Sequence, residues 1–159
     1  MNFNEIDLME KIQTFNFAEQ MRFISKPFNT VSFVVIIVAL YIYKVLDLSD
    51  VILVIKGTLL CSLIKFLFKR IRPYHASDKI KNYSGKEHKF VSDRYSFPSG
   101  HTFAATFLSL VMLNKYPSEF IFNIISILVG FSRVFLGVHY PTDIIGGMLF
   151  GFIFYQILN

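Results

Sequence analysis

Residues 31–43 read VSFVVIIVALYIY, a run that contains no charged residue. The predicted span extends to 28–48, with Lys44 and Asp47 near its end. A transmembrane helix needs about 20 predominantly apolar residues, because the hydrocarbon core of a bilayer is about 30 Å thick. The stretch 28–48 therefore predicts a membrane-spanning helix, and the polar residues Asp47, Ser49 and Asp50 predict the turn that follows it.

The composition of the whole chain agrees with a membrane setting. Its 159 residues are 53% hydrophobic and only 17% charged, whereas disordered chains combine low hydrophobicity with high net charge. The net charge of +5 attracts anions. In so apolar a chain, we expect these to be lipid headgroups of the bilayer and not nucleic acid.

Four more apolar stretches follow the first. They occupy residues 51–68, 102–113, 120–138 and 144–158. Together the five stretches predict an all-α fold, a polytopic membrane bundle of about five transmembrane helices.

The N-terminal segment 1–27 has a different pattern. It mixes apolar residues with acidic and amide residues, which predicts an interfacial helix lying on the membrane surface. Its early acidic residues, Glu5, Asp7 and Glu10, predict that no cleavable secretory signal is present.

Residues 69–100 form one long basic connection punctuated by Gly and Pro. Loops of this length in compact domains tend to be functional. Successive spans cross in opposite directions, so the end of 51–68 and the start of 102–113 lie at one membrane face. The end of 120–138 and the start of 144–158 lie at the same face. We treat residues 1–159 as a single membrane-embedded domain whose polar residues meet there.

Two cations lie at the end of the second span. Lys65 and Arg72 are seven residues apart, about two helical turns, so both project from one side of the helix. Pro73 ends the helix there. Two such cations repel each other unless an anion lies between them, although taken alone they could simply reach up to lipid headgroups.

The segment Pro98-Ser99-Gly100-His101 is typical of a helix start. Ser99 is a good N-cap and Gly100 permits close approach of the backbone. Free N–H groups at such a start bind phosphate readily, and His101 would lie beside the bound anion. In isolation the segment is more often only a cap.

The fourth span ends with further polar residues. Arg133 follows Ser132 in apolar sequence, so it is expected to face a polar cavity or an anion. His139 and Asp143 follow, and a carboxylate at one imidazole nitrogen raises the nucleophilicity of the other. A lone pair of this spacing is more often a surface hydrogen bond.

Taken together, the three patterns resemble the signature of the type 2 phosphatidic acid phosphatase superfamily. Its motifs read KxxxxxxRP, PSGH and SRxxxxxHxxxD, and all three match here, in order and without substitution. The resemblance spans residues 65–143 directly, and the arrangement of helices extends it to most of the chain.

The resemblance implies a phosphohydrolase without metal or other cofactor that forms a phosphohistidine intermediate. It makes 69–100 an active-site loop. By position, the catalytic residues are the nucleophile His139, its orienting partner Asp143, and the general acid and base His101. The resemblance assigns the phosphate-binding roles to Lys65, Arg72, Ser99, Gly100 and Arg133, with Ser132 as a further hydrogen-bonding residue.

We expect the substrate to be a phosphomonoester or diphosphate lipid, with undecaprenyl diphosphate preferred. Phosphatidylglycerophosphate, phosphatidic acid and lipid A are alternatives, because the motifs recognise phosphate and not the tail. Vanadium haloperoxidases share the motifs but are soluble and larger. A non-catalytic lipid-binding protein usually lacks motif residues, and none is lacking here. Transfer of the phosphoryl group to an acceptor other than water stays open.

The resemblance places the protein in the bacterial inner membrane with its active site facing the periplasm or exterior. All Lys and Arg except Lys44, Lys56 and Lys115 lie toward that face, which contradicts the positive-inside rule, but long loops follow that rule poorly. The family commonly has six spans. Five spans leave a lateral opening or favour a homo-oligomer.

Overall fold

The computed structural model describes residues 4–85, 94–117 and 121–159, without the side chains of 121–123. Its helices are α1 (Glu5–Ile12), α2 (Ala18–Ser25), the 3₁₀ helix η1 (Lys26–Phe28), α3 (Thr30–Ile42), α4 (Leu48–Phe68), α5 (Pro73–Ala76), α7 (Gly100–Lys115), α8 (Ile121–Phe135) and α9 (Pro141–Leu158). None of the described residues lies in a strand. The predicted all-α class is confirmed.

Each predicted membrane span coincides with a helix, namely α3, α4, α7, α8 and α9. Among the described residues, Leu48–Ala76 and Pro141–Leu158 are long and apolar enough to cross a membrane. The helices Ala18–Phe28 and Thr30–Ile42, which meet at a bend of 52°, pass the same test as one span, and Ile124–Phe135 is a shorter apolar helix. The polytopic membrane bundle is confirmed, and five crossings stay a prediction.

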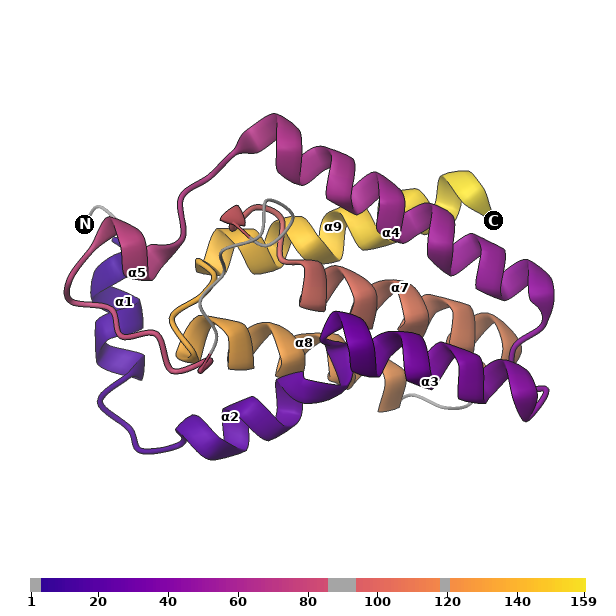
Figure 1. Ribbon diagram of the computed structural model, residues 1–159, viewed down its shortest axis with the longest axis horizontal. Helices are drawn as coiled ribbons and strands as arrows, with labels where there is room; N and C mark the ends of the chain where they lie inside the picture. Colours follow the sequence, from indigo (N-terminus) through magenta and orange to yellow (C-terminus); the bar gives the residue numbers. More distant parts are fainter. Residues whose placement is uncertain (1–3, 86–93, 118–120) are drawn as a thin grey trace.

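The long helices run along the long axis of the molecule, with α7 packed against both α8 and α9 (Figure 1). Phe103 and Phe107 of α7 are almost fully buried, and their rings stack with centroids 5.5 Å apart. Tyr155 of α9 contacts Phe107 edge-on at 5.9 Å. On α4, Gly57 faces the Phe107 ring so closely that a Cβ there would lie 2.7 Å from it. These contacts set the relative positions of the helices that carry the polar motifs.

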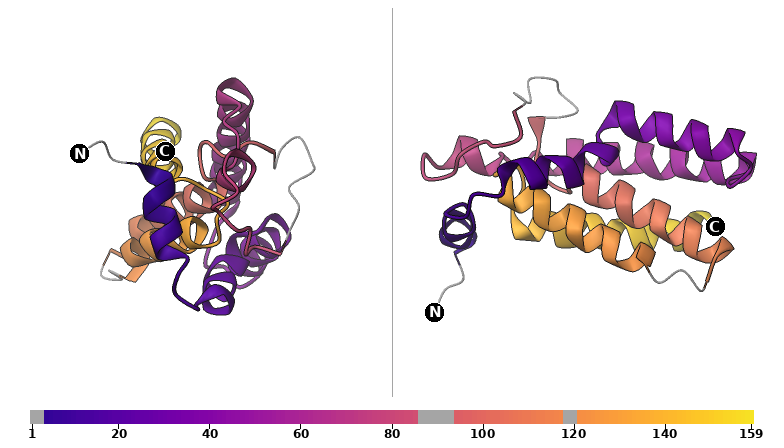
Figure 2. Two further views of the ribbon diagram at one scale, coloured as in Figure 1. Left: turned by 90° about the vertical axis from the view of Figure 1, so that its left-hand side faces the viewer. Right: turned by 90° about the horizontal axis from the view of Figure 1, so that it is seen from below.

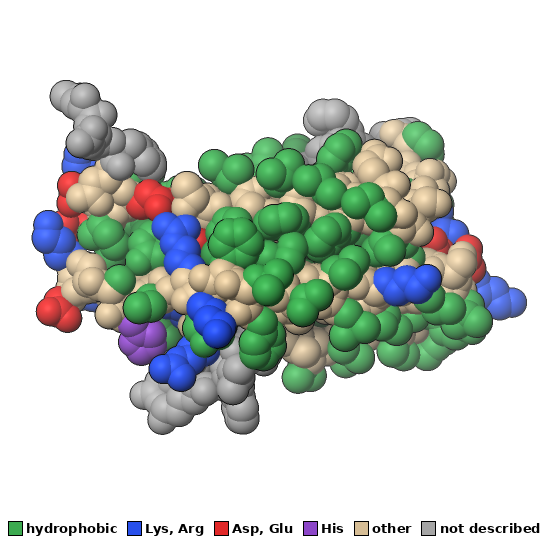
Figure 3. Space-filling model, turned by 90° about the horizontal axis from the view of Figure 1, so that it is seen from above, with side chains coloured by type: hydrophobic (Ala, Val, Ile, Leu, Met, Phe, Trp, Pro, Cys, Tyr) green, Lys and Arg blue, Asp and Glu red, His purple; other side chains and the backbone are tan. Residues whose placement is uncertain are grey.

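The outer surface of the bundle is apolar. Hydrophobic side chains cover the middle of the face in Figure 3, and charged side chains gather mostly toward its two ends. Val35, Leu59, Leu67 and Ile157 are more than half exposed. So continuous an apolar surface is suited to lipid tails and not to water.

The starts of α3 and α4 are capped by side chains that the sequence places there. Asn29 accepts a hydrogen bond from the Ser32 amide at the start of α3. Asp47 and Asp50 form a reciprocal capping box at the start of α4. At the far end of α7 from the motifs, Lys115 lies 3.0 Å from Asp47, which ties the start of α4 to the end of α7.

α8 ends at Phe135, earlier than the predicted residue 138, because Gly137 has a positive φ of 75°. A Cβ at this position would collide with the carbonyl oxygen of Lys81. Glycine therefore makes the sharp turn that separates α8 from His139.

The N-terminal segment is divided into α1 and α2, where one interfacial helix over 1–27 was predicted. α1 lies across the end of the bundle (Figure 2), and its Met9 is fully buried beside Ile80 and Val134. The apolar side of α1 therefore packs on protein. The position of the segment at the membrane surface stays a prediction.

Candidate active site

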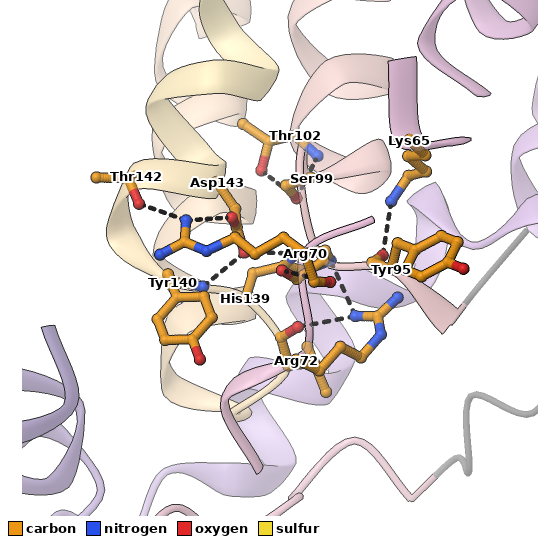
Figure 4. Close-up of polar contacts among 12 residues, drawn as sticks. Lys65, Arg70, Arg72, Tyr95, Ser99, Thr102, His139, Tyr140, Thr142 and Asp143 are labelled. Carbon is orange, nitrogen blue, oxygen red and sulfur yellow. Dashed lines mark hydrogen bonds and ion pairs between the residues drawn. The ribbon is translucent and has the colours of Figure 1, made fainter. Parts of the chain in front are cut away.

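Four helix ends meet at the end of the bundle that α1 covers (Figures 1 and 4). They are the C-terminal ends of α4 and α8 and the N-terminal ends of α7 and α9. The polar motifs lie on these ends and on the loops beside them, as the alternation of spans predicts. Each motif therefore supplies side chains to the same region.

Lys65 is buried in the last turns of α4, and its ammonium donates to the carbonyl oxygen of Tyr95 at 3.3 Å. A Cβ on Gly100 would lie 3.5 Å from Lys65 Cε, so this side chain lies against the first residue of α7. A fixed cation and the free amides of a helix start thus share one location, which favours an anion.

Arg72 lies just beyond α4 and is 2% exposed. Its Nη1 donates to the carbonyl oxygen of Val138 at 2.8 Å and lies 3.3 Å from Nε2 of His139. The guanidinium is therefore held against the imidazole edge that would face a substrate. Gathering cations in a buried region is unfavourable unless an anion binds among them.

The start of α7 is hydrogen-bonded to the start of α9. Ser99 is fully buried, its amide donates to the carbonyl oxygen of Asp143 at 3.0 Å, and its hydroxyl hydrogen-bonds with Thr102 at 2.9 Å. Gly147 of α9 lets the two backbones approach, because a Cβ there would lie 2.8 Å from the Ser99 carbonyl oxygen. His101 follows in the first turn of α7 and is half-buried.

His139 lies between a cation and a carboxylate. Its Nδ1 is 3.4 Å from Oδ2 of Asp143 and makes no hydrogen bond, while its Nε2 faces Arg72. Asp143 is fully buried, and its Oδ2 also accepts from the Tyr140 amide at 2.9 Å. We assign the tautomer with the proton on Nδ1 from this geometry, which leaves the lone pair of Nε2 toward the cations.

The surroundings of His139 also set its charge. Burial lowers the pKa of His139 well below its ordinary value, and the charges of Arg72, Lys65, Arg133 and His101 lower it further. A neutral imidazole has a lone pair available for attack, whereas an imidazolium has none. The environment therefore keeps this side chain neutral.

The fourth-span motif residues are both buried at the end of α8. Nη1 of Arg133 donates to Ser25 of α2 at 3.3 Å. The Ser132 hydroxyl donates to the Val129 carbonyl oxygen of its own helix at 2.6 Å. Its predicted hydrogen-bonding role in the site stays a prediction.

Two residues that the motifs do not include also reach the site. Arg70 forms an ion pair with Asp143 at 2.7 Å, and Glu5 of α1 pairs with Arg70 at the same distance. Arg70 lies inside the first motif at an unspecified position. The only sequence signal for Arg70 was its place two residues before Arg72. The only signal for Glu5 was its place as an acidic residue in an amphipathic segment.

In the part of the chain that the structure describes, no group of three or more His, Cys, Asp or Glu side chains could hold a metal ion. The site is built from cations, imidazoles, helix-start amides and one histidine-facing carboxylate. Such a set of groups suits a phosphate.

Comparison with protein families agrees with this reading. The model of the PAP2 superfamily matches residues 30–158. The chain belongs to the PAP2 superfamily. The match contains all three motifs, so the family resemblance that they carry is confirmed.

Proteins named as lipid phosphatases resemble parts of the chain. The lipid A 4'-phosphatase of Porphyromonas gingivalis is 35% identical over 96 residues, which are 58% of this chain and 40% of that protein. Phosphatidylglycerophosphatase B of Bacillus subtilis is 34% identical over 77 residues, 41% of this chain and 38% of that protein. The chain thus matches less than half the length of these relatives.

Solved PAP2 structures share the fold over nearly the whole chain. LpxE of Aquifex aeolicus superposes with a TM-score of 0.79 at 22% identity, covering 99% of this chain and 96% of that one. A transmembrane PAP2 type phosphatidylglycerolphosphate phosphatase from Bacillus subtilis gives a TM-score of 0.75 at 23% identity, covering 97% and 82%. The helix bundle is therefore that of a PAP2 membrane protein.

Proposed function

We propose that this protein is an integral membrane lipid phosphatase that hydrolyses a phosphomonoester or diphosphate lipid through a phosphohistidine intermediate. The observation that carries the proposal is the position of His139, buried between Asp143 and Arg72 beside the start of α7. Relatives named as lipid phosphatases support the same class of reaction.

In the first step, Nε2 of His139 attacks phosphorus. A P–N bond forms, the P–O bond to the leaving group breaks, and His101 donates a proton to the leaving oxygen. Asp143 stabilises the positive charge that develops on the imidazole ring. The product is a phosphohistidine and a free lipid alcohol or lipid monophosphate.

In the second step, a water molecule attacks the same phosphorus. His101 now accepts a proton from the water, the P–N bond breaks, and inorganic phosphate leaves. The electrons of the broken bond return to Nε2, which restores the neutral imidazole. A different acceptor in place of water would give phosphotransfer by the same intermediate.

The cations serve the transition states of both steps. Lys65, Arg72 and Arg133, together with the Ser99 hydroxyl and the Gly100 backbone amide, would bind the equatorial oxygens of the phosphoryl group. Removing one such donor at an enzyme site typically reduces kcat by about 10²–10³-fold. Because these charges take the part that metal ions play elsewhere, the proposed reaction needs no metal.

For the substrate, we propose undecaprenyl diphosphate first. Proteins named undecaprenyl-diphosphatase, from Sulfolobus acidocaldarius and Bacillus subtilis, are 42% and 38% identical over 59 and 66 residues. Phosphatidylglycerophosphate, phosphatidic acid and lipid A stay alternatives, since relatives of this chain are also named for phosphatidylglycerophosphate and lipid A. We further propose an inner-membrane location with the site toward the periplasm or exterior, and homo-oligomerisation stays open.

The test is phosphate release by the purified full chain in detergent, measured over these lipids with and without EDTA. We expect turnover of at least one lipid, unchanged by EDTA, and its loss in His139→Asn with the fold retained by circular dichroism. Substantial turnover by the variant would overturn the nucleophile assignment. Activity lost in EDTA and restored by a divalent ion would overturn the metal-free mechanism.

A further inference from the structure

Arg70 joins three segments of the chain at the edge of the candidate site (Figure 4). Its Nη1 donates to Oδ1 of Asp143 at 2.7 Å and to the Thr142 hydroxyl at 2.6 Å. Its Nη2 donates to Oε2 of Glu5 at 2.7 Å. The guanidinium also stacks on the Tyr140 ring, 3.9 Å from the ring centroid. A planar group held on two edges and one face has little freedom to rotate.

Glu5 brings the N-terminal helix α1 to the same point. Its Oε1 accepts hydrogen bonds from both the amide and the hydroxyl of Thr142, each at 2.8 Å. Thr142 immediately precedes Asp143 in the first turn of α9. Glu5 therefore contacts the start of α9 directly, and it also acts on it through Arg70.

The carboxylate stays charged in this setting. Burial raises the pKa of Glu5, but the hydrogen bonds from Thr142 and Arg70 outweigh burial and lower it overall. At neutral pH the ion pair with Arg70 is complete.

The two oxygens of Asp143 have separate partners. Oδ2 accepts from the Tyr140 amide and lies 3.4 Å from Nδ1 of His139, whereas Oδ1 receives Arg70. Asp143 is fully buried, so water does not stabilise its charge. Arg70 therefore sets the rotation of the carboxylate and compensates the charge on the side away from His139.

We propose that Arg70 and Glu5 are positioning residues that orient Asp143 toward His139, which makes α1 a working part of the active site. The inference rests on the proposed function for its kinetic test. It adds to the family motifs two residues that they leave unspecified, one of them 138 positions before Asp143 in the sequence.

α1 has other contacts that keep it in place when Glu5 is changed. Gln13 donates to the carbonyl oxygens of Lys81 and Phe135 at 2.8 and 2.9 Å, and it accepts from the Lys81 amide. Met9 of α1 is also fully buried. The variant Glu5→Gln therefore tests orientation and leaves the docking of α1 intact.

The chain offers a matched control on the same helix. Glu10 forms an exposed ion pair with Lys79 at 3.4 Å, and among the described residues it forms no ion pair with Arg70. Glu10→Gln makes the same chemical change as Glu5→Gln at another position of α1. We expect it to leave kcat and the melting temperature near those of wild type.

The kinetic test measures kcat and KM for the lipid that the wild-type chain turns over best. Arg70→Gln should lower kcat by about 10- to 100-fold with little change in KM, the range seen when outer partners of functional histidines are removed at metal sites. Glu5→Gln should lower kcat less, and in the Arg70→Gln background it should add less than its loss in the wild-type background, because part of its effect is through Arg70. Equal effects of Glu5→Gln and Glu10→Gln, or fully additive losses, would overturn the proposal.

A second measurement separates orientation from general destabilisation and does not depend on turnover. In Arg70→Gln the cation that compensates the negative charge of Asp143 is lost. The uncompensated charge of Asp143 then favours protonated His139, so the pKa of His139 should rise. The other charges that act on this imidazole, from Lys65, Arg72, Arg133 and His101, are unchanged. Arg70→Lys keeps the charge and should return the pKa toward the wild-type value, with part of kcat recovered.

The pKa is measured by NMR of histidine-labelled full-length protein, with the His139 signal identified by its absence in His139→Asn. An unchanged His139 pKa in Arg70→Gln would overturn the positioning role. If the wild-type chain releases no phosphate but the pKa rises in Arg70→Gln, the positioning of Asp143 stands and the proposed hydrolysis fails.

Discussion

His139 is buried in the loop before α9, where its neighbours decide its charge. Arg72 lies at one ring nitrogen and Asp143 at the other. Burial lowers the pKa of this imidazole most, and the surrounding cations lower it further. The Asp143 carboxylate would stabilise a positive charge that develops on the ring. A histidine in these surroundings is neutral at rest, and the carboxylate would stabilise the positive charge of the proposed phosphohistidine.

The first prediction concerns the pH dependence of catalysis. Because the neutral imidazole is the proposed nucleophile and its pKa is lowered, we expect the acid limb of kcat/KM to lie below pH 6.5, the ordinary value for histidine. The measurement is kcat/KM for phosphate release as a function of pH. An acid limb above that value would contradict the assignment.

Thermal unfolding checks the same pKa without turnover. A histidine whose folded pKa is lowered contributes stability above its unfolded pKa of 6.5, and this contribution is lost as the pH falls below that value. The melting temperature of wild type relative to His139→Asn should therefore fall from neutral pH to about pH 5. A constant difference would show that the two states of the chain bind this proton equally well.

At the scale of elements, the contact between α7 and α9 builds the end of the bundle that carries the motifs. The Ser99 amide is bonded to the Asp143 carbonyl, so the cap of one helix is joined to the first turn of the other. Gly147 makes this approach possible, and Gly151 serves the same interface one helical turn farther from the site. Small residues along α9 therefore determine how the helix start that would hold phosphate meets the orienting carboxylate.

The second prediction compares these two glycines. A Cβ at Gly147 would lie 2.8 Å from a backbone oxygen, whereas one at Gly151 would lie 3.1 Å from the Thr106 side chain. Gly147→Ala should destabilise the fold by about 1–3 kcal/mol and lower kcat, because the backbone at Ser99 must move.

Gly151→Ala should have the smaller effect on both. The gain in helix propensity is common to the two variants and cancels in the comparison. Melting temperatures and phosphate release measure the difference. An equal loss of activity in both would show that the close approach at Ser99 has no special part in the site.

At the scale of the whole molecule, the two ends of the bundle differ. One end carries the motifs, α1 and α5. At the other end Lys115 pairs with Asp47 and Asp50 at 3.0 and 2.8 Å. On the face in Figure 3, a largely apolar area separates the ends. The ends would therefore lie on opposite sides of a membrane.

The third prediction concerns which side each end faces. Cys61 is buried and is the one cysteine of the sequence, so Cys61→Ala gives a clean background. In it, Lys79→Cys lies at the site end and Tyr43→Cys at the opposite end, where the native side chains are well exposed. A membrane-impermeant thiol reagent should label the first variant in cells whose inner membrane is intact, and the second only after that membrane is opened. The reverse pattern would place the site in the cytoplasm.

Much of the fold could be predicted from local sequence. Long apolar runs in a membrane protein predict helices, so all five predicted spans coincide with helices, while five membrane crossings stay a prediction. The end of α8 was misplaced because the turn at Gly137 depends on the Lys81 backbone, which is distant in sequence. The segment 1–27 was predicted as an interfacial helix, because its apolar residues do not show by themselves whether they face lipid or protein.

The motif residues, their order and the end of the bundle at which they meet follow from the sequence by itself. Spacing and the alternation of spans are local and topological properties. Only the tertiary structure decided which residues complete the environment of His139. Arg70 and Glu5 meet Asp143 because α1 folds across the bundle end, and charges so far apart in the chain pair only after packing has brought them together.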